Sequence, residues 1–112
     1  MEKFIKNIEF SKALDMNSLV EYQAGQVVSR TLTQSKAVNI TLFAFDKDEA
    51  ISSHDSTGDA MVLILDGTAQ ITVGDGTHIV KKGEVIVMPA AVEHSLLAVE
   101  RFKMLLTVVF IK

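Results

Sequence analysis

Apolar and polar side chains alternate with a period of two from residue 26 onward, which is typical of β-strands. Residues 37–45 alternate between two faces, one with Val38, Ile40, Leu42 and Ala44 and the other with Asn39, Thr41, Phe43 and Phe45. By the same reasoning, Phe102, Met104, Leu106, Val108 and Phe110 share one face. We expect strands at residues 27–32, 37–45, 50–53, 60–65, 69–73, 78–81, 85–88, 94–99 and 102–110.

Turn-forming residues separate these segments. Asp66-Gly67 predicts a hairpin between 60–65 and 69–73, and Gly74-Asp75-Gly76 predicts the next turn. Pro89 ends segment 85–88, because proline has no backbone N–H to donate to a neighbouring strand. Segment 60–65 is apolar on both faces, so we expect it to be central. With no helical pattern between the strands, the sequence predicts an all-β sandwich or barrel.

The first 19 residues have no clear period but contain several apolar side chains, including Phe4, Ile8 and Phe10. Full burial of such a side chain is worth about 1.5 to 3 kcal/mol, so we expect an arm that packs against another surface, for which a second subunit is one candidate. We therefore divide a single domain into an N-terminal arm with an edge strand at 1–36, used in dimerisation, and a barrel at 37–112. A small barrel buries only one face of each strand, and the remaining apolar residues predict a homodimer.

Composition excludes several classes of function. The formal charge of −3 offers no basic surface for phosphates, so we expect no nucleic-acid partner. No apolar run approaches the roughly 18 to 20 residues that span a bilayer, and residues 1–10 are not typical of a secretory signal, which predicts no membrane association and a cytoplasmic location. The absence of cysteine excludes thiolate metal sites.

Two of the three histidines, His54 and His94, enclose the part of the chain richest in turns. An imidazole with an ordinary pKa near 6.5 suits proton transfer at neutral pH and also binds metals. We expect both rings to face one hollow at the mouth of the barrel. The third, His78, follows a Gly-Asp-Gly turn and is expected on the surface.

The spacing of residues 48–98 resembles that of small single-domain bacterial cupins. Their first motif reads Gly, five residues, His, one, His, three or four, Glu, six, Gly. His54 and Gly67 fit it, whereas Asp48, Ser56 and Ala60 occupy the first Gly, second His and Glu positions.

The second motif of that family reads Gly, five, Pro, one, Gly, two, His, three, Asn. Gly83, Pro89 and His94 match it, and Ala91 and Ala98 replace the second Gly and the Asn. The resemblance covers about residues 37–110 and implies a cupin-type jelly-roll β-barrel.

In metal-binding cupins three His and one Glu hold a divalent ion. Two of those four ligands are missing here, so the resemblance implies no certain cofactor. Iron, manganese, nickel or zinc would rest on His54 and His94. Asp59 or Asp55 would join them only if a bulge at Thr57-Gly58 turned its carboxylate inward.

The sequence leaves two functions open. The first is a dimeric barrel that binds a small molecule at its mouth, with ligand-binding residues His54, Asp59, Met61, Met88, His94 and Met104. The second is a metal-dependent enzyme, an oxygenase or a sugar or keto-acid isomerase, that uses His54, His94 and Asp59 as a two-histidine, one-carboxylate set.

Overall fold

The computed structural model describes residues 3–110, which form a short 3₁₀-helix, η1 (Met16–Leu19), and eight β-strands. The strands are β1 (Val27–Gln34), β2 (Val38–Phe45), β3 (Ala50–His54), β4 (Asp59–Val73), β5 (Gly76–Lys81), β6 (Val85–Met88), β7 (His94–Leu97) and β8 (Phe102–Val109). The predicted arm begins and the predicted barrel ends at residues outside those described.

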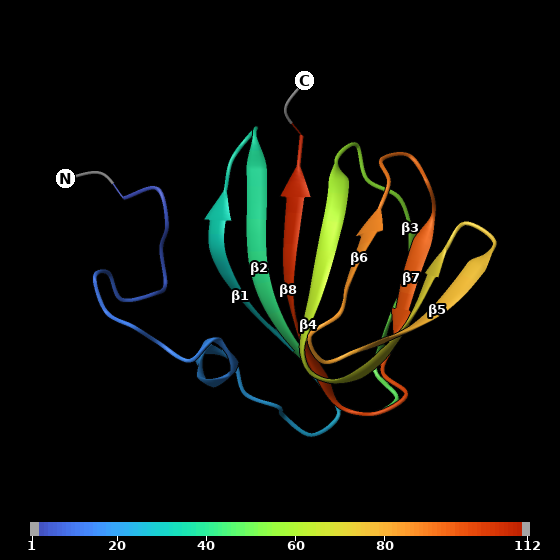
Figure 1. The fold of residues 1–112 in the computed structure, drawn as a ribbon, viewed down its shortest axis with the longest axis horizontal. Helices are drawn as coiled ribbons and strands as arrows, with labels where there is room; N and C mark the ends of the chain where they lie inside the picture. Colours follow the sequence, from blue (N-terminus) through green and yellow to red (C-terminus); the bar gives the residue numbers. More distant parts are fainter. Residues whose placement is uncertain (1–2, 111–112) are drawn as a thin grey trace.

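All strand pairs are antiparallel, in the order β1-β2-β8-β4-β7-β3, with β5 and β6 also paired to β4. The sheet curls into a half-barrel with two layers (Figure 1). One layer holds β1, β2, β8 and β6, the other holds β3, β7 and β5, and the long strand β4 belongs to both. The predicted all-β fold and the central position of residues 60–65 are confirmed.

The hairpin predicted at Asp66-Gly67 is wrong. Strand β4 continues through these residues and changes layer, with a register shift against β8 between Ile64 and Asp66. Gly67 has φ +72°, and a Cβ there would stand 1.8 Å from the Arg101 carbonyl oxygen. Because glycine tolerates both the left-handed conformation and this close approach, the strand bends where a turn was expected.

The main core fills the space between the two layers. The rings of Phe45 and Phe102 stack there with centroids 4.4 Å apart, and Met104 and Val62 are buried beside them. The predicted alternation is confirmed, since Phe43 and Phe45 face this core whereas Leu42 and Ala44 face the opposite way.

The N-terminal arm covers the outer face of β2. Leu42 is fully buried there, in a second cluster to which Ile8, Met16 and Leu19 contribute. The start of the arm follows the edge of β1, where the Lys6 N–H donates to the Leu32 carbonyl at 2.7 Å. The arm therefore packs against its own barrel.

Candidate functional site

A cavity of about 310 Å³ lies between the two layers, at the end where β2 begins and β8 ends. Its walls are mainly apolar, and its polar groups come from β2, the end of β3, the loop that follows β3, and β7. It is lined by Asn39, Ile51, His54, Asp55, Ser56, Ala60, Met88, His94, Leu96, Met104, Leu106, Val108 and Phe110.

Strands β3 and β7 bring the two predicted histidines together. His54 and His94 are direct cross-strand partners, so their side chains leave the sheet on the same side. The rings meet edge to face with centroids 4.3 Å apart, and their Nε2 atoms are separated by 3.1 Å. The prediction that both rings face one hollow is confirmed. His78 is exposed on β5, as expected.

The hydrogen bonds of the pair define its tautomers. The Nδ1 atom of His54 lies 3.0 Å from the Ser52 carbonyl oxygen, and Nδ1 of His94 lies 3.2 Å from that of Val92. A carbonyl oxygen only accepts, so each Nδ1 holds the hydrogen of its neutral ring. Both Nε2 atoms then present lone pairs to each other and to the mouth of the cavity.

Burial of His94, which is only 4% exposed, lowers the pKa of its imidazole, and the nearby His54 lowers it further. The Val92 carbonyl and the Asp55 carboxylate oppose these effects less strongly. The neutral form of His94 is therefore favoured more than that of an ordinary histidine, which is half protonated at about pH 6.5.

Four of the six residues predicted to bind a ligand line this cavity: His54, Met88, His94 and Met104. Met61, also predicted to bind the ligand, does not line the cavity, because its side chain is 46% exposed on the outer face of β4. A strand alternates faces, and the cavity-lining residue is its neighbour Ala60.

Asp59 also lies outside the cavity lining. Its side chain is exposed, and its Oδ1 accepts a hydrogen bond of 2.8 Å from the Ala90 N–H. Among residues 3–110 no three histidine or acidic side chains are placed to hold a metal ion, so the predicted set of His54, His94 and Asp59 is not formed.

The donor atoms at the cavity mouth do not fit a resident metal. Two nitrogens 3.1 Å apart would subtend roughly a right angle at an ion with bonds of about 2.0 to 2.1 Å. However, catalytic zinc sites use three protein ligands and structural sites use four. The positions that would supply the rest hold Ser56 and Ala60, and the Ser56 Oγ accepts a bond from the Gly58 N–H.

Sequence reasoning did not place Asn39 or Ser56 in the cavity, and it gave Asp55 only as a carboxylate that a bulge could turn inward. Asn39 lies on the inward face of β2 together with Phe43. The alternation along residues 37–45 already put these two residues on one face, so the direction of Asn39 could have been predicted from the sequence. Asp55 and Ser56 lie in the loop after β3, where no periodicity indicates side-chain direction.

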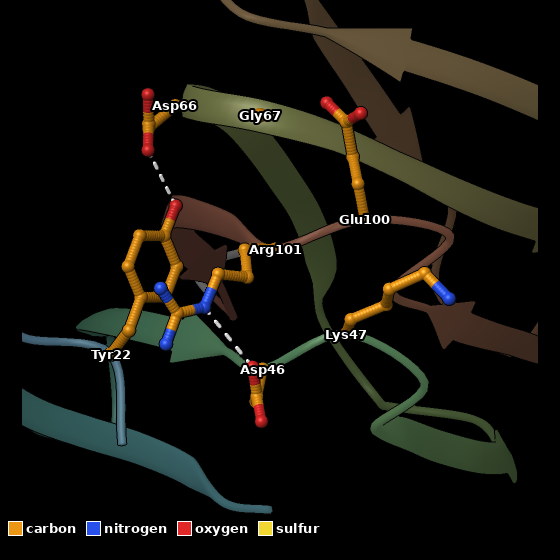
Figure 2. Close-up of a pocket in the computed structure, with 7 residues that line it drawn as sticks. All are labelled: Tyr22, Asp46, Lys47, Asp66, Gly67, Glu100 and Arg101. Atoms are coloured by element: carbon orange, nitrogen blue, oxygen red, sulfur yellow. Dashed lines mark hydrogen bonds and ion pairs between the residues drawn. The ribbon is translucent and has the colours of Figure 1, made fainter. Parts of the chain in front are cut away.

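A second hollow, of about 500 Å³, lies at the opposite end of β2 and β8 (Figure 2). It is lined by charged side chains that follow β2, lie in β4 or precede β8, and two hydrogen bonds join its central side chains. The Tyr22 hydroxyl donates to Asp66 Oδ2 at 2.5 Å, and Arg101 Nε donates to Asp46 Oδ1 at 3.1 Å while its guanidinium covers the Tyr22 ring. We interpret this cluster as the attachment of the arm to the barrel.

A sequence profile described as a cupin domain matches residues 41–110. The chain belongs to the cupin family. This match and the observed fold confirm the resemblance to cupins that the sequence indicated. No curated protein matches the chain significantly.

Several solved structures are similar over most of this chain. A conserved protein of unknown function from Streptococcus pyogenes is 47% identical, with TM-score 0.97 over 99% of this chain and 97% of that one. A cupin superfamily protein from Desulfitobacterium hafniense is 36% identical, with TM-score 0.91 over 96% and 98%. A cupin 2 conserved barrel domain protein from Leptotrichia buccalis is 40% identical, with TM-score 0.84, over 86% of this chain and 47% of that one.

Two residues at glycine positions of the cupin motifs have a backbone conformation that glycine adopts readily. Asp48 and Ala91 replace motif glycines, and both have left-handed backbones, with φ +72° and +63°. The two ligand positions of the first motif that differ hold Ser56 and Ala60 in place of His and Glu.

Proposed function

We propose that this cupin binds a small, largely apolar molecule in the cavity between its two layers, with His54 and His94 contacting the polar end of the ligand. The observation that supports this most strongly is the combination of an apolar wall with two convergent ring nitrogens at one mouth. A volume of about 310 Å³ falls at the lower end of the roughly 300 to 1,000 Å³ typical of small-molecule sites.

The absence of the motif glutamate supports ligand binding over metal-dependent chemistry. Ala60 stands at that position and lines the cavity, so a methyl group and open volume replace a carboxylate. The alternative enzyme, an oxygenase or an isomerase, required Asp59 as a third ligand, and Asp59 instead holds the backbone at Ala90. We do not propose it further.

Methionine methyl groups offer a direct test. Met88 and Met104 line the cavity, whereas Met61 is exposed on the outer face. On titration of ¹³C-methyl-methionine protein with toluene, we expect the signals of Met88 and Met104 to shift with saturation and that of Met61 to stay. Equal shifts of all three signals, or none at Met88 and Met104, would contradict binding in the cavity.

Two variants of β8 complete this experiment. Val108→Phe adds a ring to the cavity wall, and Val109→Phe adds the same ring on the opposite face, where Val109 is 45% exposed. Binding of toluene should weaken in the Val108→Phe protein and remain in the Val109→Phe protein. The reverse order would place the binding site elsewhere.

We also propose that the protein is a homodimer. Apolar side chains remain exposed on the arm, where Phe4 is 79% and Phe10 is 53% exposed, and on the outer face of β4 and β6. Large exposed apolar patches are uncommon on monomers and support a subunit contact.

A further inference from the structure

When both rings are neutral, the histidine pair lacks one hydrogen. Three close contacts, Nδ1 to the Ser52 carbonyl, Nδ1 to the Val92 carbonyl and Nε2 to Nε2, each require a hydrogen between the two atoms. Two neutral imidazoles supply only two hydrogens. The two contacts with carbonyl oxygens use both of these hydrogens. No hydrogen then lies between the two Nε2 atoms, whose lone pairs face each other at the cavity mouth.

The other polar groups at this mouth define which partner could supply the missing hydrogen. Among residues 3–110, the lining includes the Asp55 carboxylate and no lysine or arginine. Ligand carboxylates and phosphates would therefore meet two lone pairs and a negative charge with no basic side chain to offset them. The site favours a head group that donates a hydrogen bond.

We propose that the ligand is a small phenol or closely similar hydroxyl compound, whose O–H donates to the Nε2 atoms of His54 and His94. This inference rests on the proposed ligand-binding function. A hydroxyl oxygen also accepts, which suits the neutral Asn39 amide and Ser56 hydroxyl in the same lining, whereas an ammonium group only donates.

The walls suit an aromatic body. The thioethers of Met88 and Met104 face the cavity together with the Phe110 ring, and sulfur and ring edges pack favourably against aromatic faces. The hydroxyl would stay at the mouth, where the imidazoles lie, and the ring would extend towards the methionines.

Three probes with the same tolyl body separate the head groups: 4-methylphenol, 4-methylanisole and 4-methylbenzoate. Their dissociation constants are measured from the Met88 and Met104 methyl shifts at about pH 8, where ordinary histidines are neutral, with EDTA present to exclude a bridging metal ion. We expect the phenol to bind at least about tenfold more tightly than the ether, because the ether leaves the nitrogens without a hydrogen. The benzoate should bind more weakly than the phenol.

The variant His54→Ala removes one acceptor from an exposed position, and in it the ratio of phenol to ether affinity should fall towards one. The ¹⁵N signals of both Nε2 atoms in the unmodified protein should shift with the phenol and not with the ether. Equal binding of ether and phenol, or tighter binding of the benzoate, would overturn the inference while leaving cavity binding intact. If none of the three probes nor toluene shifts Met88 and Met104, both proposals fail.

Discussion

Ala91 occupies a backbone conformation that its side chain disfavours. Its φ of +63° lies in the left-handed region, which costs a residue with a Cβ roughly 1 to 2 kcal/mol. The conformation is held because the Ala91 N–H donates to the Ser56 carbonyl at 2.8 Å, which joins the loop after β6 to the loop after β3. The same conformation costs less free energy at Asp48, which has φ +72°, because aspartate tolerates the left-handed region better than alanine.

Ala91→Gly should therefore stabilise the protein. Relief of the left-handed strain exceeds the added freedom of the unfolded chain, which is worth about 0.4 to 1 kcal/mol, so we expect a net gain of about 0.5 to 1 kcal/mol in the free energy of unfolding. Urea denaturation of both proteins measures it.

The neighbouring substitution Ala90→Gly is the matched control. Ala90 does not have a positive φ, so glycine there only adds freedom to the unfolded chain and should destabilise the protein. Equal effects of the two substitutions would show that backbone strain at residue 91 is not the cause.

At the scale of elements, the arm is fixed to the barrel by Tyr22. Burial raises the pKa of its hydroxyl, and the hydrogen bond to Asp66 raises it further. Its ring also lies under Arg101 and near the Lys103 ammonium, with the charge centres 4.7 and 5.0 Å from the ring centroid. The contact joins the residues after η1 to the bend of β4.

The hydrogen bond from Tyr22 to Asp66 makes the stability of the folded protein fall at alkaline pH. Because the folded protein holds the Tyr22 proton more tightly than the unfolded chain, the stability from this group is full below the unfolded pKa of about 10 and is lost as the pH rises above it. Tyr22 is the only tyrosine in the chain, so absorbance of tyrosinate reports this group alone. We expect the folded protein to titrate well above free tyrosine.

Two substitutions of the same residue separate the hydroxyl from the ring in this prediction. Tyr22→Phe should lower the free energy of unfolding at pH 7 by about 1 kcal/mol and remove part of the alkaline loss, while Tyr22→Leu also removes the cation–π contacts and should cost more. A tyrosinate titration at the ordinary pKa would contradict the role of the Asp66 bond.

The strands were predictable from sequence and their long-range pairing was not. Alternation correctly divided residues 38–45 between two faces, because period-two burial is a local property. The bend at Gly67 was predicted to be a hairpin, because a glycine after an aspartate is compatible with both a hairpin turn and a bend within one strand. Only the pairing of β4 with β8 distinguishes the two. Likewise, the family spacing indicated His54 and His94, but their opposition across β3 and β7, 40 residues apart in sequence, became visible only in the structure.

At the scale of the whole molecule, the two outer faces differ. The arm covers the outer face of β2, where Leu42 and Ala44 are fully buried. The same layer continues through β4 to β6 without cover, and Met61 and Val87, which are cross-strand partners, are 46% and 54% exposed. Residues 3–110 contain no helix long and apolar enough to cross a membrane.

If two subunits meet through this uncovered face, a charge placed there should separate them. Val87→Lys would have to bury an ammonium group in an apolar contact, so we expect a dimer for the unmodified protein and a monomer for this variant in sedimentation velocity at micromolar concentration.

Ile79→Lys is the matched control, because Ile79 is 52% exposed on β5 in the other layer, and this variant should remain dimeric. Dissociation by Phe10→Ser but not by Val87→Lys would move the contact to the arm, where sequence alone placed it. A monomeric unmodified protein would refute the dimer itself, because the exposed valine and methionine side chains would then face water in the stable state of the molecule.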